Sequence, residues 1–307
     1  MKLLHSLRRF LASPIGREYA IRWRLFRSSL GLRALRAERR ADVLLVSYPK
    51  CGRTWLTMLL ARALANHAEH EEDVDYLATD LLGGRVDGLP HVRISHDDNP
   101  HWKRAGDLKH SKRRYRHKQV ILLVRDPRDV VVSMYFERTR RERAYSGTLH
   151  EFLREPRGSL DTILEYYNIW AQEQARPRGL CLVRYEDLQA DTAGELQRIL
   201  RFLGLEVDDF HVDEAVRFAS FESMRSMESG GTLGSGRLRA RDPGDQESFK
   251  TRKGKVGGFV DYLSLEEIAW MERRIRERLD PALGYRVPAR NGRHSRPVEL
   301  QRSGGVR

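Results

Sequence analysis

An apolar run that stops at a proline and a lysine constrains the fold of this chain more than any other stretch. Residues 42–48 contain the continuous apolar core "VLLV", which is typical of a strand buried on both faces. Pro49 ends this strand, "KCGR" follows as a tight loop, and an apolar helical pattern runs from Thr54 to His67. A loop that leads into a helix N-terminus presents free backbone N–H groups, so this one favours an anion such as phosphate.

The residue order in this loop differs from that of the usual nucleotide-binding loop. The pattern G-x-x-x-x-G-K-[ST] has its lysine near the end, whereas Lys50 precedes Gly52 here. Gly52 allows a ligand to approach the backbone closely, Lys50 adds a positive charge, and Trp55 offers an aromatic plane for a base. Taken alone, the same residues also suit an ordinary strand–helix turn with a solvated lysine.

Strand patterns alternate with helical patterns along the chain. Further strands are predicted at "HVRIS" (91–95), "QVILLVRDP" (from 119) and "LCLVRYEDL" (from 180), which leads into a helix to about residue 202. Other helices are predicted over 129–143, 160–175, 212–218 and 265–279, and the glycine-rich residues 226–258 as a long loop. This alternation predicts a single α/β domain with a central parallel sheet flanked by helices and a P-loop-like phosphate-binding loop. Ligands in such sheets bind beyond the carboxyl ends of the strands.

The net charge of +13 lies at the two ends of the chain. Residues 1–40 hold one Lys and ten Arg against two Glu, and residues 286–307 hold six Arg against one Glu, so residues 41–285 carry −1. A dedicated nucleic-acid-binding protein has its basic face on the folded domain, so we expect no nucleic-acid partner. We predict a basic helical arm over 1–40, one domain over 41–285, and a disordered tail over 286–307, which is rich in Arg, Gly, Pro and Ser.

The basic arm mixes arginine with leucine, phenylalanine, isoleucine and tryptophan at roughly helical spacing. Such a helix can lie on an anionic membrane surface, in solvent, or against the domain, and the sequence leaves these alternatives open. No run approaches the ~18 apolar residues of a membrane span. Cys51 and Cys181 have no metal-ligand neighbours and form no disulfide framework. We therefore expect no metal and a cytoplasmic location, with peripheral membrane contact through the arm as an alternative.

Two more segments suit anion binding at the same edge of the sheet. In "VRDPRDVVVS", Arg125 ends a strand and Ser133 lies two turns into the next helix, so a guanidinium and a hydroxyl could share one phosphate. "TRKGKVGG" (251–258) combines three basic residues with three glycines, as in backbone nests that bind anions. A salt-bridged helix start and a flexible basic linker are the respective alternatives. Together the three segments indicate a ligand with at least two separate phosphate groups.

"YPKCGRTW", "VRDPRDVVVSMYF", "VRYEDL" and "RKGKVGG" occur in the order and at the rough spacing of the sulfotransferase family, which the chain resembles over residues 41–280. Enzymes of that family use 3′-phosphoadenosine 5′-phosphosulfate (PAPS), so the resemblance implies a PAPS-dependent sulfotransferase. The first loop is similar to the family's 5′-phosphosulfate loop, with Cys51 in place of the usual serine and Arg53 in place of the usual threonine. The implied nucleotide-binding residues are Lys50, Cys51, Gly52, Arg53, Thr54, Trp55, Arg125, Ser133, Tyr185, Ser220, Phe221, Arg252, Lys253 and Gly254.

The resemblance also implies which part of the nucleotide each of these residues binds. Arg125 and Ser133 match the family's pair on the 3′-phosphate, and Arg252–Gly254 matches the segment that closes over the same phosphate. Tyr185 matches a tyrosine near the adenine. Ala219 lacks the hydroxyl of the family's Thr-Ser-Phe segment, so that only Ser220 and Phe221 carry over there.

The implied reaction is in-line transfer of a sulfuryl group to a hydroxyl acceptor. Lys50 and the loop amides would stabilise charge on the oxygen that stays with the nucleotide. His96, in "RISH", matches the family's histidine base, and a reference pKa of about 6.5 suits that role. His91 and His101 are the alternative bases. Lys50 and His96 are therefore our predicted catalytic residues.

The match departs from the family at Ile94, where a second catalytic lysine is common. Arg93 cannot replace it, because in a strand Arg93 and His96 face opposite sides. Either Lys50 suffices, or another basic side chain reaches in. Ile94 also favours one alternative function, a catalytically impaired nucleotide- or membrane-binding relative.

A P-loop nucleotide kinase is the other alternative. It needs a Mg²⁺-binding Ser or Thr after the loop lysine, and Cys51 stands there. For a sulfotransferase we expect a hydroxyl-bearing acceptor, which could be a small molecule, a lipid or a glycan. Residues 69–106, 137–160 and 225–250 are expected to line its pocket.

Overall fold

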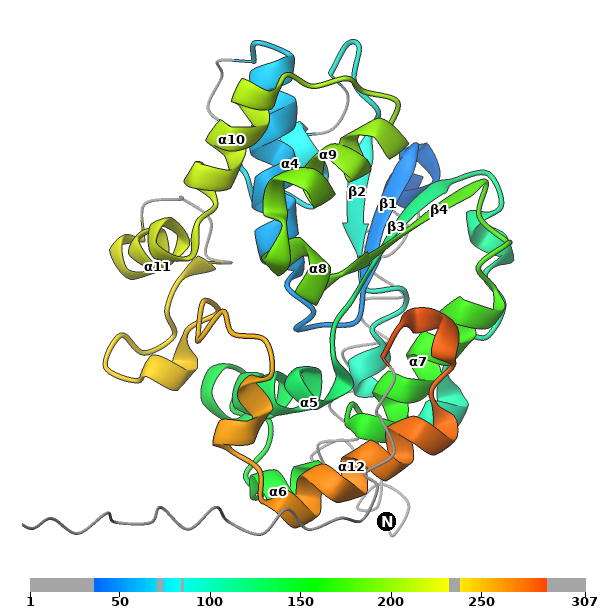
Figure 1. Cartoon of the computed structure of the whole chain (residues 1–307), viewed down its shortest axis with the longest axis vertical. Helices are drawn as coiled ribbons and strands as arrows, with labels where there is room; N and C mark the ends of the chain where they lie inside the picture. Colours follow the sequence, from blue (N-terminus) through cyan, green and yellow to red (C-terminus); the bar gives the residue numbers. More distant parts are fainter. Residues whose placement is uncertain (1–35, 71–73, 84–85, 232–237, 286–307) are drawn as a thin grey trace, which may run out of the picture.

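A four-stranded parallel sheet lies at the centre of the computed structural model, which describes residues 36–70, 74–83, 86–231 and 238–285 (Figure 1). The strands, in the order β2-β1-β3-β4, are β1 (Val43–Ser47), β2 (Val92–Ser95), β3 (Gln119–Val124) and β4 (Gly179–Arg184). All three strand pairs are parallel. The predicted α/β fold with a central parallel sheet is therefore confirmed.

Helices cover both faces of this sheet. They are α4 (Arg53–His67), α5 (Pro127–Phe136), α6 (Leu149–Phe152), α7 (Leu160–Gln172), α8 (Tyr185–Ala190), α9 (Thr192–Phe202), α10 (Asp209–Phe218), α11 (Phe221–Gly230) and α12 (Leu265–Arg278). Figure 1 shows α4, α8 and α9 on one side of the sheet, with α7 and α12 on the other. Short 3₁₀ turns join many of these elements, and one π-helical turn, η5 (Glu137–Arg141), follows α5 directly.

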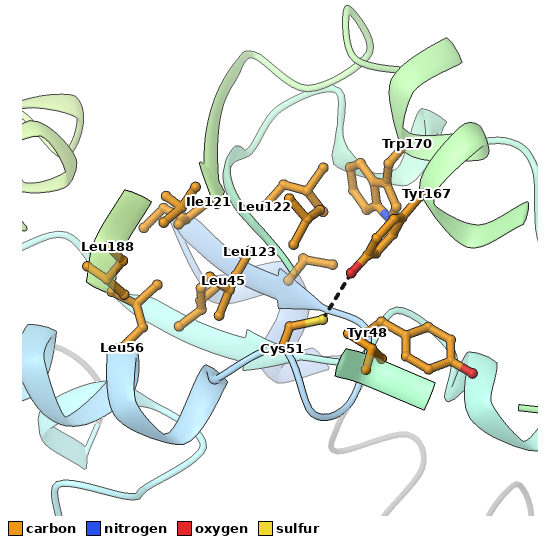
Figure 2. Packing of buried hydrophobic residues seen from close by; sticks show 14 of the residues in the cluster. Leu45, Tyr48, Cys51, Leu56, Ile121, Leu122, Leu123, Tyr167, Trp170 and Leu188 are labelled. Atoms are coloured by element: carbon orange, nitrogen blue, oxygen red, sulfur yellow. Dashed lines mark hydrogen bonds between the residues drawn. The ribbon is translucent and has the colours of Figure 1, made fainter. Parts of the chain in front are cut away.

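The side chains of β3 alternate between the two helical layers (Figure 2). Ile121 and Leu123 point toward Leu56 of α4 and Leu188 of α8, whereas Leu122 points toward α7. All of these side chains are at most 1% exposed. Because a strand presents successive residues to opposite faces, a continuous apolar run is what a strand between two helical layers requires.

Several helix boundaries differ from the sequence prediction, those of α5 and α11 among them. Helix α5 begins at Pro127 and not at residue 129, because the Asp126 carboxylate accepts the Arg128 N–H and caps the helix. Residues 226–230 were predicted as loop, but they form the end of α11, whose N-cap Ser220 accepts the Ser223 N–H. Helix α11 buries only Met224 and Glu228, so few apolar residues mark it in the sequence.

Most of the predicted basic arm lies outside the described residues. Residues 36–40 are helical, whereas residues 1–35 and the predicted tail, residues 286–307, are not described. Within the described ranges no helix is both long enough and apolar enough to span a membrane. The membrane alternative for the arm therefore stays a prediction.

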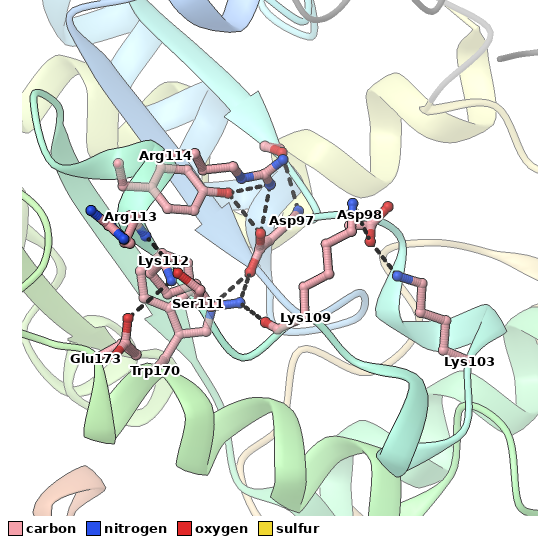
Figure 3. Close-up of polar contacts among 12 residues, drawn as sticks. Asp97, Asp98, Lys103, Lys109, Ser111, Lys112, Arg113, Arg114, Trp170 and Glu173 are labelled. Carbon is pink, nitrogen blue, oxygen red and sulfur yellow. Dashed lines mark hydrogen bonds and ion pairs between the residues drawn. The ribbon is translucent and has the colours of Figure 1, made fainter.

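A buried polar cluster holds the chain just after β2 (Figure 3). The Asp97 carboxylate accepts hydrogen bonds from Lys112 Nζ (2.6 Å), Arg114 Nη2 (2.6 Å), Tyr115 OH (2.8 Å) and Trp170 Nε1 (3.1 Å). Asp97 thus links the end of β2 to α7 and to the segment before β3.

The backbone at this cluster is left-handed over three consecutive residues. Asp97, Asp98 and Asn99 have φ angles of 51°, 74° and 50°. Asp and Asn tolerate this conformation better than most residues, although it still costs about 1 kcal/mol or more per residue. The hydrogen bonds of Asp97 offset this cost, and they fix the chain immediately after His96.

Candidate active site

The predicted site segments meet in one cleft of about 610 Å³ beyond the carboxyl ends of the strands. His96 and every predicted nucleotide-binding residue except Cys51 line this cleft. Cys51 instead faces the core and is fully buried. The structure thus brings together residues that lie up to 204 positions apart, from Lys50 to Gly254, while their roles stay predictions.

The Cys51 thiol points into the core and not toward the cleft. Its Sγ lies 3.2 Å from the Tyr167 hydroxyl (Figure 2). That hydroxyl donates to the Arg125 carbonyl (2.8 Å) and accepts the Arg125 N–H (2.9 Å), so the thiol is the donor to it. Burial raises the pKa of Cys51 to about 12. Only the backbone N–H of Cys51 is therefore available to a phosphate.

Gly52 is required by close packing in the loop. Its φ is +93°, and a Cβ there would lie 2.5 Å from Cδ2 of Tyr185. The Tyr185 ring packs edge-on against Trp55, with centroids 5.6 Å apart, and the Arg125 guanidinium lies 4.3 Å from its centroid. These aromatic and cationic groups form a wall suited to an adenine base and a phosphate.

The "RKG" segment approaches the cleft in a similar way. Gly254 has a φ of +59°, and a Cβ there would lie 2.5 Å from Cδ2 of Phe221. Gln189 Nε2 donates to the Gly254 carbonyl (2.6 Å). Arg252 pairs with Glu247 at 3.0 Å. The family match did not include Gln189, because its contact with Gly254, 65 residues further along the chain, cannot be read from a local motif.

Asp129 ties the same loop to the start of α5. Its carboxylate accepts the N–H groups of Gly257 (2.9 Å) and Phe259 (3.0 Å), and Arg125 Nη2 lies 3.3 Å away. Burial raises the pKa of Asp129. Arg128, an alternative partner in the sequence, pairs instead with Asp126 at 2.7 Å. Asp129 therefore places Arg125 and the basic loop beside one another.

Lys50 makes an ion pair that the sequence did not predict. Its Nζ lies 2.6 Å from Oε2 of Glu137, the first residue of the π-helical turn. Arg141 Nε lies 3.4 Å from the same oxygen. Although burial acts in the opposite direction, the charge of Lys50 lowers the pKa of Glu137. The loop lysine is thus already directed into the cleft by a carboxylate.

His96 is held in one tautomer. Its Nδ1 lies 3.0 Å from the Ser47 carbonyl oxygen, which can only accept, so Nδ1 carries the proton and donates. Burial, followed by the charge of Arg53, lowers the pKa of His96 well below 6.5. The ring is therefore neutral at pH 7, and Nε2 is its free acceptor. Arg53 lines the cleft with His96.

The other two histidines are less suited to act as the base. His91 does not line the cleft and bonds through Nε2 to Asp80 (2.9 Å). His101 lines the cleft, but its Nδ1 is buried without a hydrogen-bond partner among the described residues, so no contact fixes its tautomer as the Ser47 carbonyl fixes that of His96.

Arg93 in β2 lies away from the cleft, as the strand pattern predicted. Arg93 donates to Asp80 and is turned away from the cleft. Ile94 packs against the hydrophobic core. Neither residue can supply the second cation.

Lys250 also lines the cleft, and no motif pointed to it. In the sequence, Lys250 is one more basic residue just before "TRKG", at the end of residues 225–250, which were expected to line the acceptor pocket. Within the described ranges, no group of three or more His, Cys, Asp or Glu side chains is arranged to hold a metal ion.

A parallel sheet with anion-binding loops at its strand ends defines a nucleotide-binding α/β protein. A family model described as sulfotransferase domain matches residues 40–281. The chain is 26% identical over 272 residues to cytosolic sulfotransferase 17 of Arabidopsis thaliana, which covers 77% of this chain and 74% of that protein. It is 24% identical over 255 residues to amine sulfotransferase of Oryctolagus cuniculus, a match that covers 78% of this chain and 80% of that protein. The chain therefore belongs to the sulfotransferase family of PAPS-dependent enzymes.

Solved structures share the fold. A mouse sulfotransferase complexed with PAP superposes with a TM-score of 0.55 and 20% identity, covering 78% of this chain and 84% of that one. A retinol dehydratase in complex with androsterone and inactive cofactor PAP superposes with a TM-score of 0.55 and 18% identity, covering 77% of this chain and 80% of that one.

Proposed function

We propose that this enzyme moves the sulfuryl group of PAPS in line to a hydroxyl acceptor, with His96 as the general base. The observation that carries this proposal is the hydrogen bond from His96 Nδ1 to the Ser47 carbonyl (3.0 Å). It leaves Nε2 as the acceptor of a neutral ring that lines the same cleft as Lys50. A base must be deprotonated at working pH and close to the proton it removes.

In the proposed step, His96 Nε2 takes the proton of the acceptor hydroxyl. The acceptor oxygen forms a bond to sulfur while the bond from sulfur to the 5′-phosphate oxygen breaks, and the electron pair stays on that oxygen. Lys50 and the N–H groups at the start of α4 stabilise the resulting charge, as donors fixed before the reaction do in other group transfers. The product is a sulfate ester and 3′-phosphoadenosine 5′-phosphate (PAP).

The second phosphate is assigned to the other end of the cleft. Arg125 and Ser133 come from the β3–α5 unit, and Arg252 and Lys253 from the loop that Asp129 holds against it. A guanidinium, an ammonium and a hydroxyl suit a phosphate dianion. The wall formed by Tyr185 and Trp55 adjoins these groups, since the Arg125 guanidinium lies 4.3 Å from the centroid of the Tyr185 ring, and an adenine could pack against it.

We propose a small-molecule hydroxyl acceptor and a cytoplasmic location. The location is supported by a relative named as a cytosolic sulfotransferase. Lipid and glycan acceptors and membrane contact through the arm are further proposals, and residues 1–35 lie outside the described structure.

The test combines labelled PAPS with a panel of hydroxyl acceptors and identifies sulfated products by mass. His96→Ala should lower turnover by roughly 10²–10⁴-fold, the usual contribution of a general base. The affinity for PAP, measured by calorimetry, should be almost unchanged. His101→Ala serves as the matched control and should lose far less turnover. Near-normal turnover in His96→Ala would remove this histidine as the base.

A further inference from the structure

Lys250 is fixed in position by a buried carboxylate of α11. The Glu228 side chain accepts the N–H of Lys250 (2.6 Å) and both the N–H (2.8 Å) and the hydroxyl (2.6 Å) of Thr251. Glu228 itself is 1% exposed. Arg225 donates to the Thr251 carbonyl (2.7 Å), and its guanidinium lies 3.5 Å from the centroid of Phe249. The backbone that carries Lys250 is thus held on both sides of this residue.

The Lys250 side chain extends into the cleft that Lys50, Arg53 and His96 line. The charged groups around it are Lys50 and Arg53 from the first loop and α4, and Glu137 and Arg141 from the π-helical turn. The charge of Lys250 also helps to lower the pKa of His96, which follows β2. Lys250 therefore lies near both the loop lysine and the proposed base.

Lys250 differs from the other lysines in the cleft. Lys50 is paired with Glu137, and Lys253 and Lys255 are both paired with Asp261. Among the residues that the structure describes, no hydrogen bond or ion pair of the Lys250 ammonium is found within the usual distances. A partly buried cation without a direct ion pair is unfavourable, and an anion bound beside it would stabilise it.

We propose that Lys250 supplies the second cation of the transfer step, in place of the lysine that is missing at Ile94. The proposal rests on the proposed sulfuryl transfer. As the acceptor oxygen bonds to sulfur and the bond from sulfur to the phosphate oxygen breaks, His96 receives the proton and the phosphate oxygen keeps the electron pair. The Lys250 ammonium stabilises the negative charge on the transferring group and keeps its own protons throughout.

The protonation of Lys250 gives this role a distinctive pH dependence. Burial and the charge of Lys50 lower the pKa of Lys250 to about 8. A lysine is charged below its pKa, so its contribution is present at pH 7 and is lost as the pH rises through about 8. Because kcat/KM reports the groups of the free enzyme, the kcat/KM for PAPS should fall on the alkaline side in that range.

The experiment compares, for three variants, the kcat at pH 7 and the pH profile of kcat/KM for PAPS. Lys250→Gln should lower kcat at pH 7 by ~10²-fold, as the loss of one donor to a developing anion does, and should abolish the alkaline fall. Lys250→Arg keeps the charge to high pH, so it should retain more activity than Lys250→Gln and move the fall above pH 9 or so. Lys109→Gln, the same change at a 67%-exposed lysine outside the cleft, should match the wild type.

Calorimetry with PAP and thermal unfolding complete the test. An unchanged kcat and alkaline fall in Lys250→Gln would overturn the proposal and leave the sulfotransferase function intact. A weaker PAP affinity with kcat unchanged would also overturn it, because Lys250 would then only bind the nucleotide. If Lys250→Gln does not fold, a fall that stays near pH 8 in Lys250→Arg overturns it. If the wild type forms no sulfated product over the acceptor panel, the proposed function fails first.

Discussion

Replacing Asp97 by alanine should destabilise the fold more than any surface change. The side chains of Asp97 and Lys112 are each 3% exposed, and their charged atoms lie 2.6 Å apart. Without the carboxylate, the Lys109 carbonyl (2.9 Å) is the one hydrogen-bond partner left to the Lys112 ammonium among the described residues. Breaking a buried ion pair by removing one partner costs about 3–5 kcal/mol. We therefore expect the free energy of unfolding to fall by about that amount.

The assay is urea denaturation followed by tryptophan fluorescence, with linear extrapolation to water. Asp161→Ala is the control, because its carboxylate is 40% exposed and pairs with Arg274 at 2.6 Å on the surface. Exposed ion pairs contribute about 0–1 kcal/mol. If Asp97→Ala lost no more than Asp161→Ala, the cluster would not hold the segment after β2, and our account of the left-handed residues beside His96 would be refuted.

Two further predictions concern the cleft. Gly52→Ala should raise the Kd for PAP at least about tenfold. A left-handed alanine costs about 1–2 kcal/mol, and its Cβ would displace Tyr185. A wild-type Kd in calorimetry would contradict this. Because burial and Arg53 lower the pKa of His96 well below 6.5, the neutral base should persist in mildly acidic solution. The kcat should then stay level from pH 7 to pH 6, and a fall centred near 6.5 would indicate an unperturbed histidine.

The sheet was predictable because its strands are buried between two helical layers. Such strands need continuous apolar runs, and "VLLV" and "VILLV" supply them. The ends of α11 and α5 were not predictable in the same way. Helix α11 buries only Met224 and Glu228, so its stability depends on neighbours that no local pattern reveals. One of those two buried residues is a carboxylate, which sequence patterns assign to the surface.

The meeting of the anion-binding segments was predictable for a geometric reason. Parallel strands end at one edge of a sheet, so loops that follow several strands must lie near one another. The direction of the Cys51 thiol was not predictable, since it depends on the left-handed turn at Lys50 (φ 72°). The ion pair of Glu137 with Lys50 was missed because the two residues lie 87 positions apart in the sequence. Lys250 was missed because its backbone is fixed by Glu228 from another helix.

The position of Glu137 bears on why the cleft would need two lysines. Its carboxylate lies in an anion-binding cleft and pairs with Lys50 and Arg141, while Lys250 lies close enough to influence its pKa. An anionic ligand at the loop must compete with Glu137 for Lys50. Arg141 and Lys250 would still face Glu137 during that exchange, so the carboxylate would not be left as an isolated buried charge. In the proposed role of Lys250, the transferring group would meet two cations, which Lys50 alone, shared with a carboxylate, would not provide.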